Sequence, residues 1–470
     1  MPELPEVETI KNLLKPQLIN KKIVHIDVLR EKTILGDASI FKHSLENQTF
    51  IDISRIGKFL IFHLTNNMVF ISHLRMEGKY FQYKIDEPNT KHARVVFILD
   101  DGNKIIYDDS RCFGILKLST EDNYKNEEEI AKLGPEPFDI KDVNYLINKT
   151  KRSSLPIKST LLDQTIMTGL GNIYVDETLF RSKVHPLRKA NSVTKKEWEA
   201  ILANSILVLN ESIKAGGSTI RSYHPGKGID GNFQTNLLCY GKKGEHCPDC
   251  GHVFHFIKVG GRGTTFCPMC QIEKKDKIII GITGRIASGK SSVLEYVKSK
   301  GYSCISSDDI VAILYQTNRD TYQKIQDKLG VKFNSDHVEK DVLREHLIKH
   351  PKDKSKLEKI VHPMVYEYIK EWVNNQDDGL LFIEVPLLYE SKMQDYFDFI
   401  IALDIDLDKQ QERIKKRNES SYNQLLLING NNSFDNYSRI CDFLISNNKD
   451  IKELRKNIDK VINTLQHHLS

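Results

Sequence analysis

The chain has 470 residues, of which 40% are hydrophobic and 28% charged, and its formal net charge is +5. This length predicts about three domains, and the mixed composition excludes a chain that is disordered throughout. The apolar runs are far shorter than the roughly 18 residues of a membrane helix. The acidic start lacks the apolar stretch of a secretory signal. We therefore expect a monomeric, cytoplasmic protein with no membrane partner.

Positive charge is concentrated in one part of the sequence. Residues 151–275 contain 18 Lys and Arg against 10 Asp and Glu, whereas residues 276–470 contain 29 against 30. A concentration of positive charge can hold a polyanion, although an ordinary solvated surface has the same composition. A polar stretch at 271–277 precedes a new apolar run, and we place the main domain boundary there.

Short apolar segments rich in β-branched residues, separated by polar turns, occupy residues 20–118. They predict a mostly antiparallel sheet or sandwich with strands at 22–29, 59–64, 68–73, 93–99 and 104–107. Residues 141–215 predict helices, for example at 195–213, with an interruption at 169–172. The last part predicts a parallel α/β fold, because helical stretches separate apolar strands at 278–283, 381–385 and 399–404.

Four of the eight cysteines form two CxxC pairs separated by sixteen residues: Cys247, Cys250, Cys267 and Cys270. Two disulfides or four free thiols are the alternatives to a metal site. Four thiolates at this spacing match a closed tetrahedral site, so we predict one structural Zn²⁺ ion. Between the pairs, Arg262 lies among glycines in a hairpin tip expected at 260–265. There it can press on a phosphate or serve as an ordinary turn residue.

The sequence begins Met-Pro-Glu-Leu-Pro-Glu. Removal of Met1 exposes the secondary amine of Pro2, and an α-amino group with an ordinary pKa near ~7.7–8 is partly neutral and nucleophilic. A helix N-terminus lowers that pKa, whereas Glu3 and Glu6 raise it, so the net direction stays open. Proline and acids near a helix start are also ordinary capping chemistry. This segment alone therefore favours ordinary capping over a nucleophile.

Several motifs, in order along residues 2–271, resemble bacterial formamidopyrimidine-DNA glycosylase (8-oxoguanine DNA glycosylase/AP lyase). They are PELPEVET, RIGK, HLRMEG, DSRCFG, LGPEP and GLGNIY, followed by the cysteine quartet. The resemblance implies that Pro2 attacks the sugar C1′, expels the damaged base and forms an iminium ion. It also implies that Glu3 is the acid/base, and that the DNA backbone near the lesion is held by Lys58, Lys158, Asn172 and Arg262.

The same resemblance assigns three residues to the gap that a flipped-out base leaves in the stack. A base must leave the stack before its glycosidic bond is reachable, at a cost of a few kcal/mol. Met76 and Phe113 can fill the gap and Arg111 can hydrogen-bond the orphaned cytosine; core packing is the alternative for the two apolar residues. The Gly-rich segment 216–233 resembles the family's lesion-capping loop, or is a surface loop without contacts.

The family architecture implies three domains that bind double-stranded DNA containing oxidised purines. They are an N-terminal β-sandwich at 1–135, a helix-two-turn-helix domain at 136–236 and a zinc finger at 237–271.

A GxxxxGKS motif lies between an apolar strand and a helical stretch at 292–300. In such a loop the backbone amides hold phosphates, Lys290 reaches the β/γ oxygens and the Ser291 hydroxyl binds Mg²⁺. We predict that ATP with Mg²⁺ is bound by Gly284, Arg285, Ile286, Ala287, Ser288, Gly289, Lys290, Ser291 and Ser292.

Residues 276–470 resemble dephospho-CoA kinase, through GITGRIASGKS, SDDI, LEKIVHP and VPLLYE. The resemblance implies a P-loop kinase domain at 278–470 that moves the ATP γ-phosphoryl to the ribose 3′-hydroxyl of dephospho-CoA. Asp308 is the implied base or orienting group. Arg413 and Arg417 share a helix face and can clamp the phosphoryl, or form a solvated basic face. His362 is either on the substrate side or an ordinary helix-start residue.

The sequence departs from the kinase pattern at several positions. Arg285 and Ala287 stand where glycines are usual, and Lys340 stands where an arginine is common. The acidic pair is Asp308-Asp309 rather than Asp-x-Asp, so the base assignment can move by one residue. The glutamine usual after the lid is missing near 428–431. From the two resemblances together, we nevertheless predict a bifunctional enzyme. The alternative is a DNA-binding repair protein whose kinase domain is inactive or acts on another small molecule.

Overall fold

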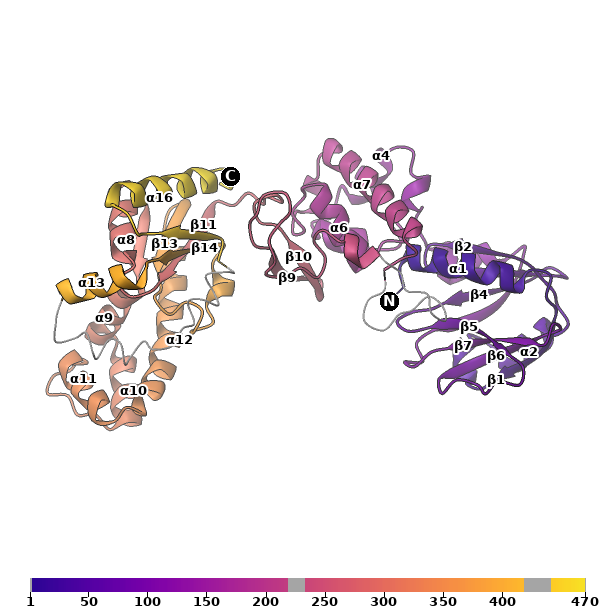
Figure 1. Ribbon diagram of the computed structural model, residues 1–470, viewed down its shortest axis with the longest axis horizontal. Helices are drawn as coiled ribbons and strands as arrows, with labels where there is room; N and C mark the ends of the chain where they lie inside the picture. The colour runs from indigo at the N-terminus through magenta and orange to yellow at the C-terminus, as the bar shows by residue number, and fades with distance from the viewer. Residues whose placement is uncertain (1, 219–232, 418–440, 470) are drawn as a thin grey trace. The chain divides into compact units, whose positions relative to one another are not determined.

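The structure is a computed structural model that describes residues 2–218, 233–417 and 441–469. The chain forms two compact units, Met1–Ile272 and Glu273–Ser470 (Figure 1). Within the described residues, no helix has the length and apolar character needed to cross a membrane.

The first part of the N-terminal unit is a sandwich of two four-stranded antiparallel sheets, with strand orders β1-β6-β7-β5 and β2-β3-β4-β8. The strands are β1 Ile23–Val28, β2 Phe50–Ile56, β3 Phe59–Leu64, β4 Met68–His73, β5 Lys79–Lys84, β6 Ala93–Leu99, β7 Asn103–Asp108 and β8 Ile115–Thr120. Phe70 of one sheet stacks on Phe97 of the other, with ring centroids 5.5 Å apart. This contact lies in the core between the sheets, and the predicted sandwich is confirmed.

Helices lie before, within and after the sandwich strands in the sequence of the N-terminal unit. Those of this unit are α1 Leu4–Leu18, α2 Ala38–Leu45, α3 Glu128–Ala131, α4 Asn144–Thr150, α5 Ile157–Leu162, α6 Asn172–Arg181 and α7 Lys195–Lys214. Helix α7 agrees with the helix predicted at 195–213, and Thr194 caps its N-terminus. The interruption predicted at 169–172 is the turn before α6. Helix α1 packs against both β2 and α7, so the start of the chain joins the sandwich to the helical part.

A two-stranded hairpin ends the first unit. Strand β9 (His255–Val259) pairs antiparallel with β10 (Arg262–Phe266). The tip is Gly260–Gly261, both at positive φ, and it is shorter than the predicted tip at 260–265. Arg262 is therefore the first residue of a strand rather than part of a loose turn.

The second unit contains one parallel sheet with strand order β12-β13-β11-β14-β15, which confirms the predicted α/β class. Its strands are β11 Lys277–Gly284, β12 Ser303–Ser306, β13 Gly379–Glu384, β14 Phe399–Asp404 and β15 Phe443–Ser446. Its described helices are α8 Lys290–Ser299, α9 Ser307–Thr317, α10 Arg319–Leu329, α11 Lys340–Lys349, α12 Asp353–Asn374, α13 Leu407–Arg417 and α16 Ile451–Gln466. Leu381 and Ile383 alternate along β13 into a core shared with α9, α10 and α12, whereas α8 and α16 pack together (Figure 1).

Candidate functional site

The first described residues of the chain are buried. Pro2 and Glu3 are buried and immediately precede α1. The Glu3 carboxylate accepts hydrogen bonds from the backbone N–H groups of Gly171 (2.6 Å) and Ile173 (3.0 Å), at the start of α6. Gly171 permits this approach, because a Cβ there would lie 2.3 Å from Glu3 Cδ. Burial raises the pKa of Glu3 to about 7, against the lowering effect of the Lys58 charge.

Two of the predicted cations, Lys58 and Arg262, affect the electrostatics around the Glu3 carboxylate. Lys58 lies in the turn between β2 and β3, is 5% exposed and donates to the Leu170 carbonyl at 2.6 Å. Burial lowers the pKa of its ammonium, Glu3 raises it and Arg262 lowers it further. Arg262 itself is exposed at the start of β10. Lys58 and Glu3 thus act electrostatically on each other, and the positive charge of Arg262 acts on Lys58.

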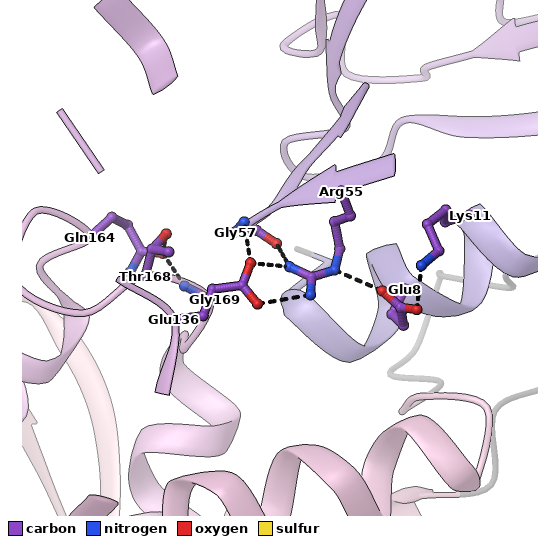
Figure 2. A network of polar contacts seen from close by, with 8 residues as sticks. All are labelled: Glu8, Lys11, Arg55, Gly57, Glu136, Gln164, Thr168 and Gly169. Atoms are coloured by element: carbon purple, nitrogen blue, oxygen red, sulfur yellow. Dashed lines mark hydrogen bonds and ion pairs between the residues drawn. The ribbon is translucent and has the colours of Figure 1, made fainter. Parts of the chain in front are cut away.

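Arg55 fixes the turn that carries Lys58 (Figure 2). Its guanidinium donates to both carboxylate oxygens of Glu136, at 2.6 and 2.9 Å, and to Glu8 of α1 at 2.9 Å. It also donates to the Gly57 carbonyl, while the Gly57 N–H donates to Glu136. One arginine therefore joins the sandwich, helix α1 and the segment that leads to the helical domain.

Lys158 lies in the interior rather than on an open surface, and Asn172 is half-buried beside it. Lys158 is completely buried, and its ammonium donates to Asp176 at 2.6 Å and to the Gly263 carbonyl at 3.0 Å. The Asn172 side chain donates to the same carbonyl at 3.0 Å. Sequence reasoning missed Asp176 and its buried neighbour Glu177. The signal is a pair of acids inside the otherwise apolar helix sequence NIYVDETLF.

The three residues predicted to fill the DNA stack lie on two loops of the sandwich. Met76 follows β4 and is half-buried, whereas Arg111 and Phe113, between β7 and β8, are exposed, Phe113 by 55%. The Arg111 guanidinium lies 5.2 Å from the centre of the Phe113 ring. Buried Asp109 holds this loop by accepting from the N–H groups of Arg111 and Gly114. The exposure of Phe113 argues against core packing for it.

The four predicted zinc ligands converge. The Sγ atoms of Cys247, Cys250, Cys267 and Cys270 all lie within 4.8 Å of one another, and this set is the one candidate metal cluster in the described residues. Four soft thiolates at such separations fit tetrahedral Zn²⁺, so the donor chemistry matches the predicted ion. The predicted lesion-capping segment, in contrast, lies largely outside the described residues.

The phosphate-binding motif forms a loop between β11 and α8. Gly284, Ala287 and Gly289 all have positive φ, at 148°, 59° and 99°. A non-glycine residue in the left-handed region costs roughly 1–2 kcal/mol, so Ala287 is strained where the usual pattern has glycine. Lys290 donates to the carbonyls of Gly284 and Arg285, each at 3.0 Å. The lysine thus lies under the loop whose amides hold phosphates in such sites.

Helix α13 packs on this loop through polar side chains. Arg413 donates to the Ala287 carbonyl (3.3 Å) and the Asn447 carbonyl (3.0 Å), while the Asn447 amide donates to Ser288 at 2.8 Å. An open cavity of about 350 Å³ lies beside these groups. The backbone of Arg417 ends α13, and its side chain, like residues 428–431, is outside the described part.

A second cavity, of about 230 Å³, is lined by Asp308, His362 and mostly apolar neighbours. Asp308 is exposed in the first turn of α9, and His362 lies in the middle of α12, so it is not a helix-start residue. Sequence reasoning missed Glu384, the last residue of β13. Burial raises the pKa of Glu384, opposed by the Lys290 charge. Its signal is an acid that ends the apolar strand sequence GLLFIE.

Together, these features define a DNA glycosylase unit joined to a P-loop small-molecule kinase unit. The chain belongs to the formamidopyrimidine-DNA glycosylase family. Residues 1–116 match the formamidopyrimidine-DNA glycosylase N-terminal domain, 133–224 its H2TH domain and 244–272 the zinc finger found in FPG and IleRS. Residues 278–453 match dephospho-CoA kinase, so the chain is a fusion of the two.

Relatives of the first unit are similar over their whole length. The formamidopyrimidine-DNA glycosylase of Bacillus cereus is 46% identical over 274 residues, 58% of this chain and 99% of the relative. That of Streptococcus pneumoniae is 46% identical over 275 residues, again 99% of the relative. A crystal structure of a Lactococcus lactis FPG mutant with Fapy-dG DNA shares 39% identity with a TM-score of 0.55, and covers 57% of this chain and 99% of that one.

Proposed function

We propose that the first unit excises oxidised purines from double-stranded DNA and cleaves the strand, and that the second unit phosphorylates dephospho-CoA. Formamidopyrimidine-DNA glycosylases of known sequence cover the first unit, and Lactococcus structures of this family hold Fapy-dG or abasic-site DNA. The dephospho-CoA kinase match covers most of the second. Because DNA, ATP and dephospho-CoA are all available in the bacterial cytoplasm, we propose that location.

The observation that carries the repair function is Glu3, a buried carboxyl with a pKa near neutrality beside the chain start. With Met1 removed, the Pro2 nitrogen attacks C1′ of the deoxyribose; the bond from C1′ to the base breaks, and its electron pair leaves with the base. The nitrogen then loses its proton, and its lone pair forms the C=N bond of an iminium ion as the C1′–O4′ bond of the sugar ring breaks and O4′ takes up a proton. Loss of the acidified C2′ proton expels the 3′ phosphate, and loss of the C4′ proton then expels the 5′ phosphate. A carboxyl with a pKa of about 7 can both give and take protons in these steps.

Cations and loops around Glu3 supply the binding. Lys58 and Arg262 are proposed to hold phosphates beside the lesion, since charged hydrogen bonds to phosphate fix the register of DNA. Met76, Arg111 and Phe113 are proposed to occupy the gap in the stack, where an exposed phenyl ring replaces the lost base contacts. The four cysteines are proposed to hold the zinc that shapes the finger, and the ion supplies structure rather than chemistry.

The kinase function is proposed because the second unit has two separate cavities, one beside the GKS loop and one lined by Asp308 and His362. The GKS loop is proposed to hold the ATP phosphates, and Ser291 is proposed as a Mg²⁺ ligand. Glu384 is proposed as a nearby carboxylate that orients the Mg²⁺ ion. When bound, Mg²⁺ would neutralise charge on the phosphates. The cavity with Asp308 and His362 is proposed to hold dephospho-CoA. Asp308 orients the ribose hydroxyl and accepts its proton as the oxygen bonds to the γ-phosphorus, while the bond from that phosphorus to the β–γ bridging oxygen breaks and ADP leaves. Arg413, and Arg417 after it, stabilise the transferring group.

Two variants test both activities in one preparation. Pro2→Gly replaces the secondary amine, and we expect a loss of borohydride-trapped complex with an 8-oxoguanine duplex while CoA formation continues. Lys290→Ala removes the loop cation, and we expect loss of CoA formation while DNA cleavage is unchanged. Each variant is the matched control of the other. Undiminished trapping by Pro2→Gly would reject the proline nucleophile, and a preference for a nucleoside monophosphate as acceptor would reject dephospho-CoA.

A further inference from the structure

Lys158 belongs to a buried set of polar groups that joins two helices to the finger hairpin. Its ammonium, with no exposed surface, donates to Asp176 of α6 and to the Gly263 carbonyl of β10. The second oxygen of Asp176, a residue only 1% exposed, accepts from the Thr265 N–H at 3.1 Å. The hairpin strand is thus held through its own backbone, at the carbonyl of one residue and the N–H of another.

The same strand carries Arg262. Gly263, whose carbonyl accepts from both Lys158 and Asn172, directly follows it in sequence. The neighbouring acid of α6, Glu177, accepts from the N–H groups of residues 238, 239 and 240, so α6 grips the finger at its entry and at its hairpin. The start of α6 also holds Glu3. One helix therefore sets the position of the carboxyl at the chain start and of the hairpin that carries Arg262.

A buried ammonium with a carboxylate partner has little to gain from DNA. To reach a phosphate, Lys158 would have to leave Asp176 unpaired in the interior, and an uncompensated buried charge is strongly unfavourable. We propose that Lys158 and Asp176 form an internal ion pair that positions Arg262 through the backbone of β10, and that Lys158 makes no contact with DNA phosphate. This inference rests on the proposed repair function of the first unit and differs from the role that the family resemblance implies for Lys158.

The first test is the salt dependence of DNA binding. Each phosphate that a protein neutralises adds about 0.9 to the slope of log K against log salt. We expect Lys158→Met to keep the wild-type slope on a duplex with a tetrahydrofuran abasic-site analogue, whereas Arg262→Ala lowers it by about 0.9. A slope lowered by Lys158→Met as much as by Arg262→Ala would overturn the proposal. Lys158→Gln, which keeps a donor for Asp176 and Gly263, gives the same readout if the methionine variant does not fold.

The second test asks whether Lys158 acts through Arg262. We expect Lys158→Gln to lower the single-turnover rate of base release by about 10- to 100-fold, the effect of a small misplacement of catalytic groups, with unchanged affinity. In the double variant with Arg262→Ala, the two losses in rate should be less than additive, because Lys158→Gln acts on catalysis only through the placement of Arg262, whose charge still neutralises its phosphate. Fully additive losses would overturn the proposal. Lack of cleavage by the wild type would instead reject the proposed repair function. The two failures can be told apart, because the salt slopes report binding and do not depend on catalysis.

Discussion

At the scale of single residues, the site depends on groups whose charge state is set by burial. Glu3 keeps two backbone donors yet loses its hydration, and the second effect dominates, so its pKa rises to about 7. Lys58 shows the opposite sign for the same reason, because burial penalises its ammonium. Both shifts bring the pKa values of the two groups closer together, and the pKa of Glu3 lies where its carboxyl can give and take a proton near neutral pH.

We expect the pH dependence of base release to follow Glu3. Below pH 7 the carboxyl is mostly protonated and can donate, and above it the group is mostly ionised, so a step that needs the donor slows as pH rises. Glu3→Gln carries no such proton, and we expect a loss of about 10²- to 10⁴-fold together with disappearance of the limb near pH 7. Single-turnover base release across the neutral range measures both. A limb that persists in Glu3→Gln would assign the titration to another group.

At the scale of elements, the sequence predicted what local pattern encodes. The apolar strands of the sandwich and the P-loop strand were predicted correctly, but β2, β5 and β8 were missed, because segments such as KYFQYK bury only part of their residues. No local pattern indicated that Asp308 and Asp309 of α9 act electrostatically on Glu384 of β13. The burial of Lys158 was equally hidden, since its partner Asp176 is eighteen residues away in sequence. Long-range pairing of charges, unlike periodicity, leaves no local trace.

Arg55 connects the sandwich, helix α1 and the segment that carries Glu136. We expect removal of the Glu136 carboxylate to weaken this connection. Glu136→Gln replaces a doubly hydrogen-bonded carboxylate under a largely buried guanidinium, and we expect a loss of about 1–3 kcal/mol in unfolding free energy. Urea unfolding in a Trp372→Phe background measures it, because Trp198 is then the single tryptophan and lies in the core of the first unit.

The matched control is Glu128→Gln. Its carboxylate is 85% exposed and 3.8 Å from Lys132, so we expect a change within about 0.5 kcal/mol. Equal effects of the two substitutions would show that the Arg55 connection contributes nothing beyond an exposed ion pair.

At the scale of the whole molecule, two units with separate cores carry separate chemistry. The first unit holds the basic segment and the cysteine cluster, whereas the second holds the nucleotide loop and nearly balanced charge. The ligand groups proposed for each activity lie within one unit, so we expect neither activity to need a residue from the other. The finger differs from both cores: its buried cluster is small and includes Cys247 and Cys267 themselves, which makes the metal part of its stability.

Removal of zinc should therefore separate the two activities. A chelator selective for Zn²⁺ over Mg²⁺ leaves four thiols without their ion, and the hairpin that presents Arg262 loses its closure, since metal binding energy is folding energy in such sites. We expect cleavage of an 8-oxoguanine duplex to fall at least tenfold and to return with added Zn²⁺, while phosphorylation of dephospho-CoA with saturating Mg²⁺ and ATP stays unchanged. Cys250→Ser, which removes one exposed ligand, should reproduce the loss irreversibly. Full cleavage by the zinc-free protein would mean that the finger folds without the metal, and a parallel fall in phosphorylation would mean that the two units are coupled.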